Sequence, residues 1–241
     1  NPRLLTALVD ALHDADPLMR HAGLNALGQL PPKHRWLLAD ERLQDSVRSV
    51  RILAAVMLAD VSSEEMPASQ QVNFAEASQE YLHSLEFSAD DPGAQVSLGD
   101  FHAARGEPVE AEQAYREALL LDKNWVPAYI NYADLLRRMH RDAEGEAVLR
   151  EGLAHRPEAG ALQHGLGLLL VRKKDFSNAL VFLKQAAELE PDVIRYSYIY
   201  AVALHSAGQS ALAQAVVKSA LMKTPNDPAL NALRAQLMKE N

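Results

Sequence analysis

The chain has 241 residues, of which 48% are hydrophobic and 23% are charged, a composition that is ordinary for one or two soluble globular domains. Its formal net charge of -8 argues against a general nucleic-acid binder, because phosphate contacts need a basic face. The absence of cysteine excludes disulfides, thiolate metal sites, iron–sulfur clusters and cysteine nucleophiles within this chain.

The distribution of apolar residues predicts an all-α fold without membrane insertion. No apolar run approaches the roughly 18 residues of a membrane-spanning helix, and the longest candidate is Gly165 to Val171. Strand-like alternation is scarce. The first residue is Asn and a helical pattern, PRLLTALVDALHD, is already under way. We therefore expect a fragment of a longer protein, with any targeting segment outside it.

Residues 1–61 contain two similar stretches, HDADPLMRHAGLNALGQLP and LQDSVRSVRILAAVMLADV. Asp14 aligns with Asp45, and Arg20 aligns with Arg51 at the same offset. An Asp, then an Arg, then a stripe of Ala and Leu resembles the second helix of a HEAT-like repeat. The resemblance implies two short helical repeats, at about 1–30 and 32–61.

A polar stretch, VSSEEMPASQQ at 61–71, is the best candidate for a boundary. Residues 72–91 then predict one helix, because Ala77 and Tyr81 are in phase with the repeats that follow. We interpret this helix as a half-repeat that joins the two parts of the chain as one continuous arc.

From residue 92 onward the chain repeats itself without insertion or deletion, with a period of about 34 residues. Small residues recur in two series, Gly99, Ala133, Gly167, Ala201 and Ala111, Gly145, Ala179, Ala213, and a third series is bulky, Tyr115, Leu149, Leu183, Val217. The small residues let two antiparallel helices approach, and the bulky ones fill the space between neighbouring pairs. Pro157, Pro191 and Pro225 end the second helices, since proline removes a hydrogen-bond donor.

This pattern resembles the tetratricopeptide repeat family, and the four units are 92–125, 126–159, 160–193 and 194–227. The resemblance implies a right-handed superhelical α-solenoid in which stacked helix pairs bury each other's apolar faces. The chain departs from the family pattern in lacking its Trp and its first proline, at Gln95, Tyr129, Gln163, Ser197 and Lys123. Residues 228–241 predict a C-terminal capping helix, with Asp227 as N-cap and Pro228 at its first position.

The combination of the two repeat types is similar to the C-terminal part of certain bacterial envelope proteins that carry a multihaem cytochrome region. That resemblance implies an alternative function, a docking or assembly region of a larger redox protein whose haem part lies outside this chain. It also implies a periplasmic or envelope location, whereas a cytoplasmic one is expected otherwise. No CxxCH motif occurs here, so no cofactor is expected.

The sequence carries no recognisable catalytic constellation, and we expect no enzymatic activity and no metal. None of the nine histidines has a metal-ligand spacing, and no GxSxG motif, P-loop or dinucleotide fingerprint is present. His164 and His205, on first helices of adjacent repeats, are the nearest approach to a shared ligand site.

The tetratricopeptide resemblance implies that the first helices line a concave groove that binds a protein or peptide. We therefore expect a non-enzymatic interaction scaffold; a domain that selects substrates for an attached enzyme is a third hypothesis. The expected groove residues are Asp100, Ile130, Asn131, Asp134, Arg138, His164, Leu168, Arg172, Arg195, Tyr198, Val202 and His205. Val96 and Asp100 stand where a chaperone-tail clamp needs Lys and Asn, which argues against that class of partner. The sequence names neither the partner nor the oligomeric state.

Overall fold

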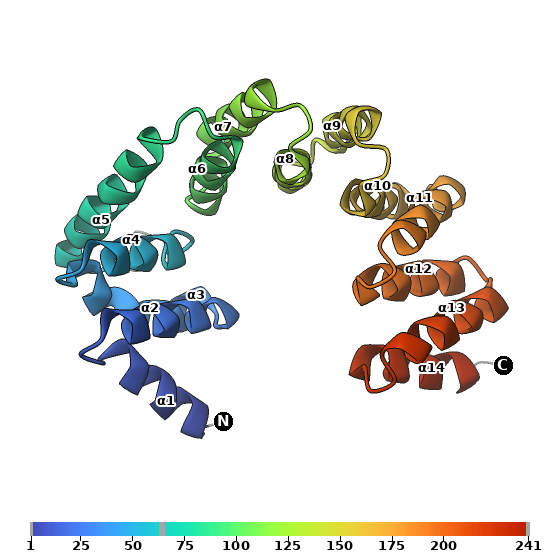
Figure 1. The fold of residues 1–241 in the computed structure, drawn as a ribbon, viewed down its shortest axis with the longest axis horizontal. Helices are drawn as coiled ribbons and strands as arrows, with labels where there is room; N and C mark the ends of the chain where they lie inside the picture. The colour runs from blue at the N-terminus through green and yellow to red at the C-terminus, as the bar shows by residue number, and fades with distance from the viewer. Residues whose placement is uncertain (1, 63–65, 240–241) are drawn as a thin grey trace. The chain divides into compact units, whose positions relative to one another are not determined.

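A computed structural model describes residues 2–62 and 66–239 of the chain (Figure 1). Within these residues every regular element is a helix, and no strand is present. The chain is thus an all-α solenoid, as the repeat pattern predicts. Residues 63–65 of the polar stretch 61–71, residue 1 of the HEAT-like part and residues 240–241 of the expected capping helix lie outside the described residues.

The chain divides into two compact units, Asn1–Leu121 and Asp122–Asn241. The α-helices of the N-terminal unit are α1 (Pro2–Leu12), α2 (Pro17–Ala26), α3 (Pro32–Ala39), α4 (Arg48–Met57), α5 (Ala68–Glu86), α6 (Pro92–Ala104) and α7 (Pro108–Leu121). Phe74 and Ala77 of α5 share one buried cluster with Leu24 of α2 and Val50 of α4. The helix that follows the polar stretch therefore packs into the same core as the helices before it.

A repeated arginine contact underlies the similarity of the two N-terminal stretches. Arg20 Nη1 donates to the Asp14 carbonyl at 2.9 Å, and Arg51 Nη1 donates to the Asp45 carbonyl at 2.7 Å. Each arginine also binds a carboxylate further along the chain, Asp45 for Arg20 (Nε to Oδ2, 2.7 Å) and Glu80 for Arg51 (Nη2 to Oε1, 2.7 Å). The HEAT-like identity of residues 1–61 stays a prediction, but its Asp and Arg positions have equivalent contacts.

The first of these ion pairs is buried. Burial alone would raise the pKa of the Asp45 carboxyl, but hydrogen bonds from Arg20 and from the Val47 backbone outweigh burial and hold the pKa below its usual value. Asp45 is therefore an ionised, fully bonded link between α2 and the start of α4.

The C-terminal unit contains α8 (Val126–Arg138), α9 (Asp142–His155), α10 (Gly160–Arg172), α11 (Phe176–Leu189), α12 (Ile194–Ser206), α13 (Ser210–Lys223) and α14 (Pro228–Lys239). The starts of α8, α10, α12 and α14, at positions 126, 160, 194 and 228, keep the period expected from the sequence. The last helix buries Leu230, Leu233 and Leu237 in one cluster with Ala213 and Val217 of α13.

The small residues of the repeat lie where helices approach each other closely. A Cβ atom on Gly99 would stand 2.5 Å from Tyr115 Cε1, and one on Gly167 would stand 2.7 Å from Leu183 Cδ2. The turn inside each helix pair also repeats, since Gly106, His140, Lys174 and Gly208 all have positive φ, between 58° and 77°. Two of these four turns therefore place a non-glycine residue in the left-handed region.

Candidate functional site

The groove residues expected from the sequence fall on alternate helices of both units. Asp100 lies on α6 of the N-terminal unit, where its carboxylate accepts a hydrogen bond from the buried Tyr115 hydroxyl at 2.7 Å. The other eleven lie on α8, α10 and α12 of the C-terminal unit. Asp100 thus has a structural contact of its own, and the rest form the candidate surface.

Side-chain contacts link α8 to α10 and α10 to α12. Ile130 of α8 lies against α10. Its Cδ1 is so close to Gly165 that a Cβ atom built on this glycine would stand 3.3 Å away. His164 of α10 stacks on Tyr196 of α12 with ring centroids 4.6 Å apart and planes inclined by 29°. The three helices therefore present a continuous set of side chains.

The apolar members of the set are half-buried. Ile130, Leu168, Tyr198 and Val202 each keep part of their surface exposed, and Tyr198 and Val202 also pack against the cluster of α12, α13 and α14. A side chain that is anchored in this way offers apolar area to a partner without having to become ordered first.

The cationic members differ in how they are held. Arg172 binds Asp142 at the start of α9 (Nη2 to Oδ1, 2.7 Å), and this hydrogen bond holds the pKa of Asp142 below its usual value. Arg138 pairs with Asp134 on its own helix at 3.4 Å. Arg195 is exposed and makes no ion pair within residues 2–62 and 66–239. Arg172 is therefore oriented by a neighbouring helix, whereas Arg195 has its full donor capacity for a partner.

His164 is buried more deeply than its groove assignment implies. Only 7% of it is exposed, and neither ring nitrogen has a hydrogen-bond partner in the described part of the chain. Burial, with a smaller effect of the Arg195 charge, lowers the pKa of His164 to about 4. The ring is thus neutral at physiological pH and contributes mainly by stacking on Tyr196.

The structure separates His164 from His205. His164 stacks at the start of α12, on Tyr196, whereas His205 stands near the end of that helix and its Nδ1 lies 3.0 Å from Ser210 Oγ. The two positions on α12 are about 13 Å apart along the helix axis. The described residues contain no group of three or more His, Asp or Glu that could hold a metal ion.

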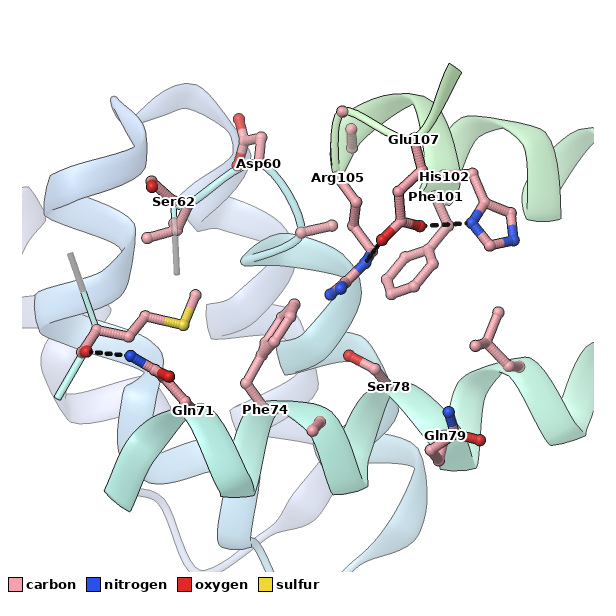
Figure 2. A pocket seen from close by; sticks show the side chains of 17 residues that line it. Asp60, Ser62, Gln71, Phe74, Ser78, Gln79, Phe101, His102, Arg105 and Glu107 are labelled. Atoms are coloured by element: carbon pink, nitrogen blue, oxygen red, sulfur yellow. Dashed lines mark hydrogen bonds and ion pairs between the residues drawn. The ribbon is translucent and has the colours of Figure 1, made fainter. Parts of the chain in front are cut away.

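A pocket of about 610 Å³ in the N-terminal unit was not expected from the sequence (Figure 2). Its walls come from residues 59–62, Met66, helix α5, the end of α6 and the turn that joins α6 to α7. Phe74 and Phe101 form its aromatic side, and His102, Arg105 and Glu107 stand together at its edge. The aromatic pair was the only sequence signal, and it does not stand apart from an ordinary helical core.

No helix in the described ranges is long and apolar enough to cross a membrane.

The chain is similar in sequence to known proteins. A family model described as tetratricopeptide repeat matches residues 170–237, which include α11 to α13 and most of α14. Protein FlbA of Caulobacter vibrioides is 27% identical over 156 residues, covering 65% of this chain and 26% of FlbA. The chain thus spans only about a quarter of the length of this relative.

Two solved structures share the fold. Yeast Tom70 is 19% identical with a TM-score of 0.64, covering 99% of this chain and 50% of Tom70. A thermophilic TPR protein of Thermus thermophilus is 18% identical with a TM-score of 0.55, covering 80% of this chain and 99% of that one. At these identities the likeness concerns the fold alone. The sequence match to a tetratricopeptide repeat thus covers residues 170–237, and the chain as a whole shares the helical-solenoid fold of such proteins.

Proposed function

We propose that the chain is a non-enzymatic scaffold that binds a segment of another protein along α8, α10 and α12 of the C-terminal unit. Proteins of the tetratricopeptide-repeat class generally mediate protein–protein interaction. The proposal for this surface rests on half-buried apolar side chains combined with two arginines. Arg172 is held in place by Asp142, and Arg195 has its hydrogen-bond donors available for a partner. Apolar anchors supply most of the affinity of such surfaces, and charges fix the register of the partner.

The apolar anchors of the proposed site are Tyr198 and Leu168, on neighbouring helices. Tyr198 combines a large ring, part of which packs on the core of the unit, with a hydroxyl for a polar contact. Arg172 follows Leu168 by one helical turn on α10, and Arg195 precedes Tyr198 by about one turn on α12. These two cations favour a partner segment that carries carboxylates. An acidic segment with one or two apolar side chains is therefore the partner chemistry that fits best.

We expect Tyr198→Ala and Arg172→Ala each to weaken partner binding about tenfold or more, with helix content unchanged. Tenfold corresponds to about 1.4 kcal/mol, within the range of a central contact residue. The partner is first captured with the wild-type chain and identified by mass spectrometry. Its affinity for each purified variant is then measured by titration calorimetry, and helix content by circular dichroism.

Matched controls come from the second helix of the third repeat. Lys184 is an exposed cation and Phe176 an exposed aromatic, both on α11. Lys184→Ala and Phe176→Ala should leave the affinity unchanged. Equal affinities for the wild type and the Tyr198 and Arg172 variants, or an equal loss in the controls, would place the binding surface elsewhere.

A further inference from the structure

We propose that the pocket in the N-terminal unit binds a carboxylate carried on an apolar group, with Arg105 and Ser78 as its hydrogen-bond donors. This site is independent of the proposed surface on α8, α10 and α12, because all its residues belong to the N-terminal unit. Its volume of about 610 Å³ lies within the range of small-ligand pockets.

Arg105 stands at the C-cap of α6 and is held on two sides. Its guanidinium carbon lies 5.3 Å from the ring centroid of Phe74 and 5.8 Å from that of Phe101. Its Nε donates to Glu107 Oε1 at 2.8 Å. The Nη1 and Nη2 groups have no partner in the described ranges, and Figure 2 shows this end of the side chain pointing into the pocket. A planar group with two such donors matches the geometry of a carboxylate.

The two carboxylates at the pocket are already paired, so they do not oppose an anionic ligand as free charges would. Glu107 Oε2 lies 2.7 Å from His102 Nδ1 in addition to its contact with Arg105. Burial alone would raise the pKa of Glu107, but these two hydrogen bonds lower it below its usual value. Asp60 forms an ion pair with Arg35. The polar capacity that remains unused at the pocket is therefore mainly that of donors.

Ser78 supplies the second donor, from the opposite wall. Its residue is only 5% exposed, and its hydroxyl oxygen has no hydrogen-bond partner in the described part of the chain. In Figure 2 the hydroxyl points from α5 into the pocket. A buried hydroxyl without a partner is costly, and an acceptor on a ligand would satisfy it.

The remaining walls require the ligand to have an apolar body. Phe74, Phe101, Met66, Leu82 and Val61 all line the pocket. Phe101 is fixed by an edge contact with Tyr81 at 5.1 Å between ring centroids. A carboxylate next to an aromatic or aliphatic group therefore fits both the donors and the walls. Such a group occurs in small organic acids and at the C-terminal residue of a peptide, and the experiment separates these sources.

The test compares acids with their neutral amides by titration calorimetry on the whole chain. The probes are hydrocinnamate against hydrocinnamide, and acetyl-Ala-Ala-Phe with a free C-terminus against its C-terminal amide. We expect at least one acid to bind saturably and about tenfold or more tightly than its amide, because hydrogen bonds to a charged group are the stronger ones. Binding of hydrocinnamate alone indicates a small acid as the natural ligand, and binding of the peptide acid alone indicates a chain end.

Variants link the binding to the two donors. We expect Arg105→Gln to lower acid affinity about tenfold and Ser78→Ala to lower it severalfold, with amide affinity unchanged in both. Arg116→Gln is the control, since Arg116 is an exposed arginine of α7 that pairs with Glu112 outside the pocket. Circular dichroism melts check that each variant is folded, and if Arg105→Gln melts early, Ser78→Ala and the acid–amide contrast decide.

Three results would overturn the proposal: no binding of either acid at millimolar concentration, equal affinity for acids and amides, or full acid affinity in folded Arg105→Gln and Ser78→Ala variants.

Discussion

Lowering the pH from about 7 to about 4.5 is expected to reduce the free energy of unfolding of the C-terminal unit by about 2 kcal/mol through one side chain, His164. The imidazole is buried against Tyr196, and neither nitrogen has a hydrogen-bond partner among the described residues. A proton on this ring would be a buried charge without compensation.

The direction of the effect follows from the pKa values of the two states. His164 has an ordinary pKa of 6.5 in the unfolded chain and a pKa of about 4 in the folded one. Between these values the unfolded chain binds a proton that the folded chain does not. Stability therefore rises with pH across this window and is lost as the pH falls from about 6.5 towards about 4, by about 3 kcal/mol in full.

The measurement is urea unfolding followed by circular dichroism at the two pH values, for the wild type and His164→Phe. Phenylalanine keeps a ring against Tyr196 but cannot be protonated, so the variant should lose about 2 kcal/mol less than the wild type on acidification. His155→Gln, at an exposed position on α9, should behave as the wild type. An equal loss of stability in the wild type and His164→Phe would show that His164 is not the responsible group.

The positions of the repeat helices could be predicted from the sequence because one physical requirement sets the period. Where Gly99 and Gly167 stand, a partner side chain already occupies the space of a Cβ atom. Such a position accepts only the smallest residues, so Gly or Ala recurs there once in every repeat. The helix starts at 92, 126, 160 and 194 follow from the same phase.

How deeply the groove side chains are buried, and which ion pairs they form, could not be predicted in the same way, because both depend on contacts that do not repeat. The phase places His164 on the groove side of α10, but its burial is set by Tyr196 of the next helix pair. Arg172 is oriented by Asp142. The positions equivalent to Asp142 in the other repeats are Pro108, Phe176 and Ser210, none of which is a carboxylate. A contact that occurs only once produces no repeated pattern in the sequence.

The pocket of the N-terminal unit was hidden for a related reason. Its proposed donors are Ser78 on α5 and Arg105 at the C-cap of α6, and Met66 and Val61 come from a third stretch of the chain. Each residue alone has an ordinary explanation, as a helix surface or as part of a core. Their convergence is a consequence of how α5 packs against its neighbours, which sequence spacing does not encode.

Replacing Gly99 by Ala is expected to destabilise the N-terminal unit by a net roughly 1 kcal/mol, although Ala is the better helix former. The new Cβ atom would stand 2.5 to 2.9 Å from three ring atoms of Tyr115. Tyr115 is 1% exposed and its hydroxyl donates to Asp100 at 2.7 Å, so the ring cannot move away without losing that bond. Overpacking of this kind costs roughly 1 to 3 kcal/mol and exceeds the helix gain of about 0.5 to 1 kcal/mol. Urea unfolding at neutral pH measures the difference.

The repeat supplies both the control and the rescue for this substitution. A Cβ atom on Gly145 would meet its nearest neighbour at 3.5 Å, an ordinary contact, so Gly145→Ala should stabilise the chain by up to about 1 kcal/mol. The second repeat carries Ala133 and Leu149 at the places of Gly99 and Tyr115. Tyr115→Leu should therefore make room for Gly99→Ala, and the double variant should lose about 1 kcal/mol less than the sum of the two single variants. Strict additivity would mean that the two side chains do not compete for one space, and the close approach of α6 and α7 would then not be what keeps residue 99 small.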